Sequence, residues 1–168
     1  RHWIIDGPTE QFVASMVYNG KYAFVTGGYP ERHILAIRPE GSGNVTETHI
    51  AWRVKKGASY VPSPVVVGPY FVIVSDSGIA SCFNAENGTR LWMERLGGGH
   101  SASAITTGGL AYFVSDRGIT SVLKPGPKFE VIAKNDLKEL VSSSPAISQG
   151  KIFIRGQKHL FCIGKQID

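Results

Sequence analysis

The chain has 168 residues, of which 42% are hydrophobic and 18% are charged, and this balance excludes an intrinsically disordered chain. Its longest apolar run, residues 65–74, is broken by Gly68 and Pro69 and is far shorter than the roughly 20 residues of a membrane-spanning helix, so we expect no membrane insertion. The net charge of +5 comes from scattered Lys and Arg, without the basic stripe of a nucleic-acid-binding protein.

The first predicted element is a short strand at residues 1–6, which contains Trp3. Trp52 and Trp92 each stand 11 residues before a serine that opens a new run of strands, and Trp3 stands 12 residues before Ser15, a serine of the same kind. We therefore interpret residues 1–6 as an outer strand that lacks the three strands expected before it.

Residues 12–55 form the first predicted unit, with short runs rich in Val, Ile, Phe and Tyr that include "KYAFVTG", "HILAIR" and "IAWRV". Such runs, separated by Gly or Pro, are typical of β-strands. The polar stretch "PEGSGNVTETH" makes this unit eight residues longer than the next one. We expect that stretch to be a surface loop, where insertions are tolerated.

The pattern recurs at residues 61–96, 102–134 and 142–164, and the last unit has only three predicted strands. The serines that open the four units, at spacings of 48, 40 and 41 residues, are Ser15, Ser63, Ser103 and Ser144. Four strands in about 40 residues is the pattern of a propeller blade. Residues 1–168 are therefore predicted to form a single all-β segment, a β-propeller of four-stranded antiparallel blades with about four blades.

The second unit, "SPVVVGPYFVIVSDSGIASCFNAENGTRLW", resembles the repeat of the pyrroloquinoline-quinone-type β-propellers. In that repeat a strand ending in Ala-Leu-Asp-Ala is followed by Thr-Gly and a final Trp. Here Asn84 replaces the Asp, Asn87-Gly88 replaces Thr-Gly, and Trp92 closes the unit. The repeat is also similar to that of the propeller lipoproteins of bacterial outer-membrane protein assembly. The resemblance implies a bacterial extracytoplasmic protein, periplasmic or on the cell surface, and a full ring of seven or eight blades.

One strand is spare at the start of the chain and one is missing at its end, and unpaired strand edges of this kind readily pair with other strands. Three arrangements satisfy them. The chain closes as a four-bladed ring, two chains close an eight-bladed ring as a homodimer, or the chain is the second half of a longer propeller. The implied blade number favours a half-propeller, which in isolation would pair with itself.

Residues 75–92, "SDSGIASCFNAENGTRLW", hold an acid, hydroxyls and a cysteine, yet their start recurs as "SDRGITSVLKPG", which indicates a structural role. Asp76 and Asp116 stand in turns between second and third strands, where Asp and Gly provide capping and positive φ. The Asn-Gly pair at Gly88 predicts a hairpin turn. The residues predicted to pack between blades are Trp3, Trp52 and Trp92.

Cys82 and Cys162 lie two repeat lengths apart, at the same position of the third strand as Ala36 and Val122. Equivalent positions in blades separated by another blade are too far apart for a disulfide. We therefore expect two buried free thiols that fill the core.

No residue of the chain is predicted to catalyse a reaction or to bind a metal or cofactor. Dehydrogenases of the resembling family place the quinone against two adjacent cysteines and bind calcium through Glu, Asn and Asp, and neither pattern is present. The stretch "LGGGHSASA", residues 96–104, lacks the lysine and the helix of a phosphate-binding loop. The five histidines lack the spacing of metal ligands.

In a propeller, the turns between second and third strands share a face with the connections between blades. Residue types that are enriched at protein contacts fall on this face: Tyr29, Arg32, Tyr60, His100 and Arg117. The leading interpretation is a non-catalytic scaffold for protein–protein interaction, with a protein partner that the sequence does not identify. The alternative is a fragment of a quinone-dependent alcohol or sugar dehydrogenase.

Overall fold

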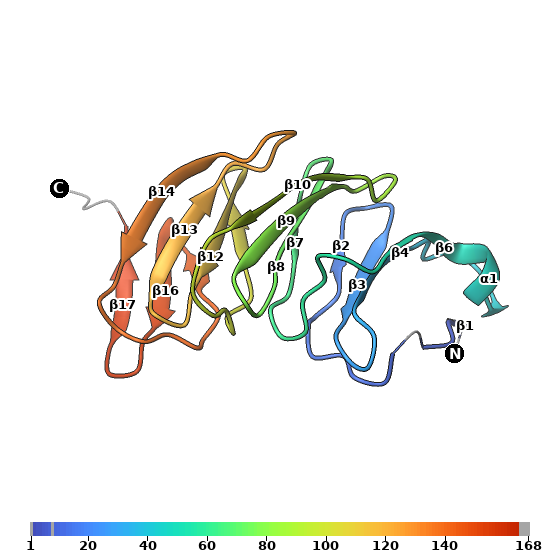
Figure 1. The fold of residues 1–168 in the computed structure, drawn as a ribbon, viewed down its shortest axis with the longest axis horizontal. Helices are drawn as coiled ribbons and strands as arrows, with labels where there is room; N and C mark the ends of the chain where they lie inside the picture. Colours follow the sequence, from blue (N-terminus) through green and yellow to red (C-terminus); the bar gives the residue numbers. More distant parts are fainter. Residues whose placement is uncertain (1, 8, 165–168) are drawn as a thin grey trace.

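The computed structural model describes residues 2–7 and 9–164, and in this range four antiparallel sheets lie side by side along an arc (Figure 1). Each of these sheets is a meander, in which each strand pairs with the next strand of the same sheet along the chain. This arrangement is an all-β partial propeller with four blades, so the predicted fold class is confirmed.

The blades follow the order of the chain. Blade 1 contains β2 (Val17–Tyr18), β3 (Ala23–Gly27), β4 (His33–Ile37) and β6 (Ile50–Val54). Blade 2 contains β7 (Val65–Val67), β8 (Tyr70–Val74), β9 (Ile79–Asn84) and β10 (Arg90–Arg95). Blade 3 contains β11 (Ile105–Thr107), β12 (Leu110–Val114), β13 (Ile119–Leu123) and β14 (Val131–Asp136). Blade 4 contains β15 (Ala146–Ser148), β16 (Lys151–Arg155) and β17 (Leu160–Ile163).

The strand expected at residues 1–6 is the two-residue β1 (Trp3–Ile4), and its partner is not the last blade. β1 pairs in parallel with β5 (Gly43–Asn44). β5 belongs to the polar insertion of blade 1, together with the one-turn helix α1 (Thr46–His49). The last blade lies at the opposite end of the arc, out of reach of the first strand of the same chain (Figure 1).

The turns between second and third strands are tight and lie close to the connections between blades. In blade 2, the Ile79 N–H donates to Ser75 Oγ at 3.1 Å, and Gly78 has a φ of +78°. A Cβ on Gly78 would lie 2.2 Å from the carbonyl oxygen of Gly98, so only glycine fits there. Blade 3 repeats this close approach at Gly118.

The core lies between the blades. Phe24 of blade 1 packs against Phe71 of blade 2, with ring centroids 5.2 Å apart. Cys82 and Val72 of blade 2 share a buried cluster with Phe113 of blade 3. An inner blade is covered on both faces, so its strands show little alternation between apolar and polar residues.

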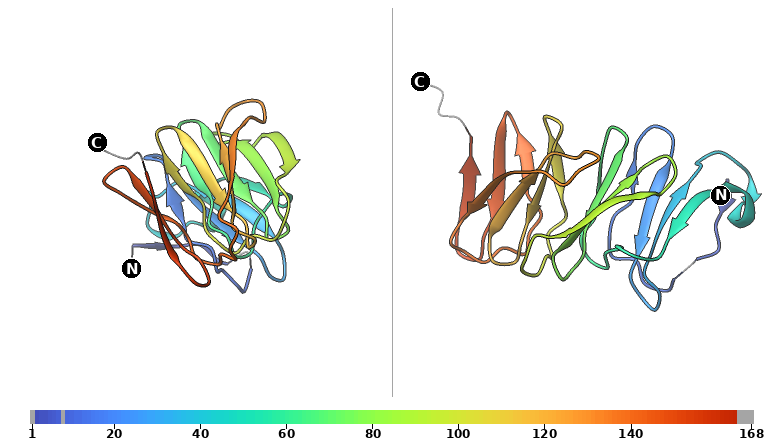
Figure 2. Two further views of the ribbon diagram at one scale, coloured as in Figure 1. Left: turned by 90° about the vertical axis from the view of Figure 1, so that its left-hand side faces the viewer. Right: turned by 45° about the horizontal axis from the view of Figure 1, so that its top comes forward.

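Within the described ranges, blades 1 and 4 each have one face without a neighbouring blade. Figure 1 places them at opposite ends of the arc, and the turned views of Figure 2 show the same open arrangement. Of the three arrangements expected from the sequence, the closed four-bladed ring within one chain is therefore not the one adopted.

Candidate interaction site on the crossover face

One face of the arc is formed by the turns between second and third strands and by the connections between blades, and we call it the crossover face. Its segments in blades 1 to 3 are residues 28–32, 55–61, 75–78, 96–101 and 115–118. The five predicted contact residues lie in these segments. The structure divides them into two groups, one between blades 1 and 2 and one between blades 2 and 3.

Asp76 joins the turn of blade 2 to the connections on both sides of that blade. Its carboxylate accepts hydrogen bonds from the backbone N–H groups of Tyr60, at 3.1 Å, and Val61, at 2.9 Å. Its backbone carbonyl accepts the N–H of His100 at 3.0 Å. Hydrogen bonds to a carboxylate are stronger than neutral ones, so these connections are firmly held.

Asp116 has the same role in blade 3. Its carboxylate accepts the Ser101 N–H at 2.8 Å, and its own N–H donates to the Gly99 carbonyl at 2.8 Å. Both aspartates have a structural role. Their carboxylates accept N–H groups of the connections between blades and do not cap their own turns. The turns themselves are capped by the hydroxyls of Ser75 and Ser115.

Tyr29 and Arg32 are the exposed members of the first group. Tyr29 is 56% exposed, and its backbone carbonyl accepts the N–H groups of Glu10 and Gln11 at 3.1 Å each. The Arg32 guanidinium lies 3.8 Å from the Asp76 carboxylate, with about half of its side chain exposed. Because exposed ion pairs stabilise a fold little, Arg32 remains available to bind another molecule.

Tyr60 belongs to the framework of the face. Its ring covers Gly28 so closely that a Cβ on Gly28 would lie 2.0 Å from the ring. Its hydroxyl forms a hydrogen bond with the Gln11 side chain. A substitution of Tyr60 would therefore disturb the fold, whereas the sequence predicted a free contact residue.

His100 is buried, which corrects its prediction as a contact residue. It is 3% exposed, and neither ring nitrogen has a hydrogen-bond partner among the described residues. Burial lowers the pKa of His100, so the ring is neutral at pH 7. His100 lines a cavity of about 350 Å³ together with the exposed residues Arg117 and Lys134.

Glu139, on the connection between blades 3 and 4, is a residue that the sequence analysis misses. Its carboxylate accepts the backbone N–H of His159 at 2.9 Å and lies 2.7 Å from His159 Nδ1. These bonds, the one with the His159 ring above all, lower the pKa of Glu139 to about 2. Glu139 ties the connection to the turn in blade 4, as Asp76 does in blade 2, but here the carboxylate comes from the connection and the N–H groups come from the turn. The turn of blade 4 has Gln157 in place of the aspartate. The absence of an aspartate from the turn of blade 4 was the sequence signal that another acid, Glu139, takes its place.

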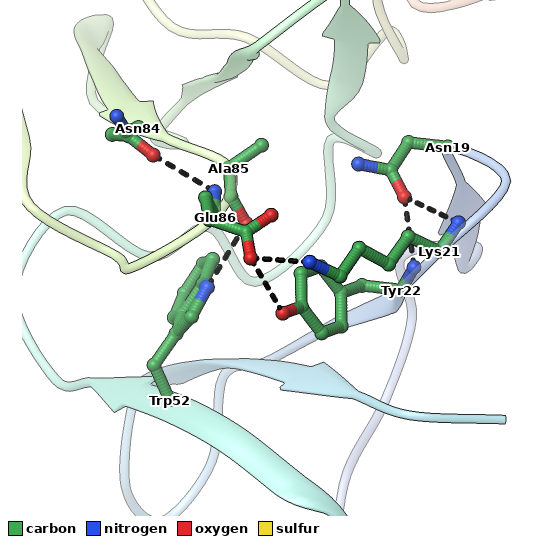
Figure 3. A network of polar contacts seen from close by, with 7 residues as sticks. All are labelled: Asn19, Lys21, Tyr22, Trp52, Asn84, Ala85 and Glu86. Carbon is green, nitrogen blue, oxygen red and sulfur yellow. Dashed lines mark hydrogen bonds and ion pairs between the residues drawn. The ribbon is translucent and has the colours of Figure 1, made fainter. Parts of the chain in front are cut away.

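On the opposite face, tryptophans join blade 1 to blade 2 and blade 2 to blade 3. Trp52 Nε1–H donates to the Ala85 carbonyl in the hairpin of blade 2 at 3.0 Å (Figure 3). Trp92 donates in the same way to Gly126 of blade 3 at 3.0 Å. Gly88 lies against the Trp52 indole, where a Cβ would be 2.8 Å from the ring.

An exposed polar network lies beside Trp52. The Glu86 carboxylate of blade 2 accepts the Tyr22 hydroxyl of blade 1 at 3.1 Å and pairs with the Lys21 ammonium (Figure 3). The Asn84 side chain accepts the backbone N–H of Glu86 at 2.8 Å. The hairpin face is thus tied from blade to blade, as the crossover face is.

Cys82 and Cys162 are both free thiols. Cys82 is fully buried, and burial raises its pKa to about 12. Cys162 is exposed, so its predicted burial is wrong. The two residues do occupy equivalent positions, opposite Val72 and Phe153 of the second strand. They differ because, in the part of the chain that the structure describes, neither a fourth strand nor a neighbouring blade covers this face of blade 4.

Among residues 2–7 and 9–164, no group of three or more His, Cys, Asp or Glu side chains is placed to bind a metal ion. Within the same residues, no helix has the length and apolar character needed to span a membrane. The glycine-rich stretch at residues 96–104 forms the connection between blades 2 and 3.

Comparison with known proteins identifies the fold. No family model matches the sequence, and no curated protein matches it. The chain is similar to the crystal structure of BamB from Moraxella catarrhalis, with a TM-score of 0.75 and 12% sequence identity. That match covers 96% of this chain and 49% of the BamB chain, so this chain spans about half the length of that protein. The chain is also similar to the computationally designed Ika4 protein, with a TM-score of 0.71, 10% identity and 98% of each chain covered.

Proposed function

We propose that the chain is a non-catalytic scaffold that binds another protein through the crossover face. The observation that supports this function most is the exposure of Tyr29, Arg32 and Arg117 on turns whose backbone is hydrogen-bonded to neighbouring segments. Glu10 and Gln11 hold the turn of blade 1 through the Tyr29 carbonyl, and the Asp116 N–H ties the turn of blade 3 to Gly99. Loops that are already ordered lose little entropy on binding. Tyr and Arg are among the residues that contribute most to the affinity of protein contacts.

The charges of this face favour an acidic segment of the partner. The carboxylates of Asp76 and Asp116 accept backbone N–H groups, and Glu31 pairs with Lys55 at 2.8 Å. Arg117 forms no ion pair with any residue that the structure describes. Arg32 and Arg117 therefore present positive charge that a partner carboxylate would neutralise.

The proposed setting is bacterial and extracytoplasmic, in the periplasm or on the cell surface. It is supported by the resemblance of the blade 2 repeat to the quinone-type propellers and by the fold shared with BamB. The proposed partners are another protein at the crossover face and a second copy of the chain at the open ends of the arc. Fractionation of source cells with an antibody against the chain tests the setting, and recovery in the cytoplasm would contradict it.

Site-specific photocrosslinking tests the proposed contact. A photoreactive amino acid in place of Tyr29 should form a covalent adduct with one protein, whereas the same group in place of Lys21, on the hairpin face, should not. Arg117→Ala should weaken formation of that adduct by about fivefold to thirtyfold, since a central contact contributes roughly 1–2 kcal/mol, and should leave the melting temperature unchanged. Equal adducts at both positions, or none at Tyr29, would reject the proposal.

A further inference from the structure

We propose that two copies of this chain pair through the open faces of blades 1 and 4 and close one ring of eight blades. In this ring the N-terminal strand of each copy completes the last blade of the other. Three features of the open ends support this pairing: the position of Trp3, the incomplete last blade, and a chain of serines that is open at both ends. None of them involves the exposed contact residues of the crossover face.

Trp3 occupies the position of an outer-strand tryptophan from a preceding blade. Its Nε1–H donates to the Pro39 carbonyl of blade 1 at 2.7 Å. Trp52 donates in the same way to Ala85 of blade 2. Pro39 and Ala85 are equivalent positions, because Pro39 lies three residues after Ala36 and Ala85 lies three residues after Cys82. Ala36 and Cys82 are the third-strand residues that pair with the tryptophan of the fourth strand in blades 1 and 2. β1 therefore lies where the fourth strand of a neighbouring blade belongs.

Within residues 2–7 and 9–164, blade 4 has three strands, and β1 corresponds to the fourth strand of a blade. β17 is the outermost strand of its sheet, with no outer partner among the described residues. Its Leu160 is 67% exposed, whereas the equivalent Ala80 of blade 2 is fully buried beside Cys82. An unpaired strand edge exposes a row of backbone donors and acceptors. When blade 1 of a second copy covers this face, that copy brings its residues 2–6 to the edge of β17.

The serines that open the four units form a relay from blade to blade. Ser15 N–H donates to Ser63 Oγ at 2.8 Å, Ser63 N–H to Ser103 Oγ at 3.1 Å, and Ser103 N–H to Ser144 Oγ at 3.0 Å. Within the described residues, the relay leaves a free donor at Ser144 N–H and a free acceptor at Ser15 Oγ. Pairing places the donor of one copy against the acceptor of the other, so that the relay continues around the ring.

The open faces of blades 1 and 4 also match each other in the uncharged side chains that they expose, and two copies together supply eight blades. Blade 1 presents Tyr18, which is 60% exposed, and the half-buried Val25 on the face that has no neighbour. Blade 4 presents Leu160 and Cys162 on its own open face. Two copies together match the length of the BamB chain, of which one copy spans 49%. A pair related by a two-fold axis uses both ends of both copies, so no open end remains.

Size-exclusion chromatography with light scattering tests the pairing. The chain should have a mass of twice 18.2 kDa at high concentration and should dissociate on dilution. Leu160→Lys, on the open face of blade 4, and Trp3→Ala, in the N-terminal strand, should each weaken pairing at least tenfold. Met93→Lys is the matched control, because Met93 is partly exposed in blade 2, away from both ends, and this variant should pair like the original chain.

A second measurement uses the original chain alone. At concentrations where the mass doubles, Cys162 should react with a thiol reagent at least tenfold more slowly than in the dilute chain, while the buried Cys82 stays unreactive throughout. A single-chain mass at every concentration, assemblies that grow beyond two chains, or a dimer in which Cys162 still reacts fast would each overturn the proposal. Arg117→Ala separates the two proposals, since it should weaken partner binding and leave the mass unchanged.

Discussion

Strands β9 and β17 carry the same part of the repeat, in blade 2 and blade 4, yet they differ in burial. Residues 80–83 of β9 are fully buried, whereas Leu160 and Ile163 of β17 are 67% and 44% exposed. Blade 2 lies between two sheets and is completed by β10, while blade 4 has, among the described residues, one neighbouring blade and three strands. The sequence of a blade therefore determines its strands, and the neighbouring blades determine which of its side chains are buried.

The largest effect that separates the two blades should come from truncating equivalent apolar residues. Phe83→Ala should lower the free energy of unfolding by about 3–5 kcal/mol, because it leaves a cavity in the cluster between blades 1 and 2. Ile163→Ala should cost less than about 1 kcal/mol, since much of that side chain is already in water. Urea unfolding measures both values. Equal losses would contradict the difference drawn between inner and end blades.

Two hairpin glycines test the same point, because one contacts a neighbouring blade and the other has open space around it. Gly88→Ala should destabilise the fold by roughly 2–3 kcal/mol, because φ is +72° and the new Cβ would lie 2.8 Å from the Trp52 ring of the neighbouring blade. Gly108→Ala, at φ +57° with open space around it, should cost only about 1 kcal/mol. Thermal unfolding of the two variants, followed by circular dichroism, gives the difference. A larger loss at Gly108 would show that contacts between blades do not set the cost.

The serine relay predicts a smaller effect. Ser103→Ala removes the acceptor of the Ser63 N–H and should cost about 1 kcal/mol, because Ser63 is buried and its donor is left unpaired. Ser15→Ala, in the dilute single chain, should change stability by less than about 0.5 kcal/mol, since the Ser15 hydroxyl ends the relay. Chemical denaturation at low concentration distinguishes these outcomes. A loss at Ser15 as large as that at Ser103 would argue against an open end.

The fold could be predicted from the sequence because strands, tight turns and the period of the repeat are local features. The serine spacing predicted four units, and the structure joins those serines into one relay. The polar stretch of blade 1 was expected to be a loop, and it contains β5 and α1. Its pairing with β1 could not be predicted, because two-residue strands leave no hydrophobic pattern.

The candidate site could be predicted less well, because exposure depends on how neighbouring blades pack. Tyr29 and Arg32 are exposed, as residues in turns often are. His100 carries the same polar character in the sequence, but the connection that contains it is pressed between blades 2 and 3 and buries the ring. The exposure of Cys162 could not be predicted, because the repeat pattern shows which strand position the residue occupies but not whether another blade covers it.

The buried His100 predicts the smallest effect, a dependence of stability on pH. Burial lowers its pKa in the folded chain, so between the unfolded value of about 6.5 and that lower value the unfolded state binds more protons. Stability should therefore be fully present above pH 6.5 and should fall as the pH drops below it. His33, whose pKa burial also lowers, acts in the same direction. Urea unfolding at pH 7.5 and 5.5 should show a weaker pH dependence for His100→Phe than for the original chain.

The most direct test of the difference between inner and end blades is a count of the thiols that react in the dilute, native single chain. We expect one fast-reacting thiol, Cys162, because no blade covers it. Cys82 should react only after unfolding, since burial raises its pKa to about 12 and keeps the reagent away. If both thiols react at the same rate in the native single chain, or if neither does, neighbouring blades do not determine burial in this protein.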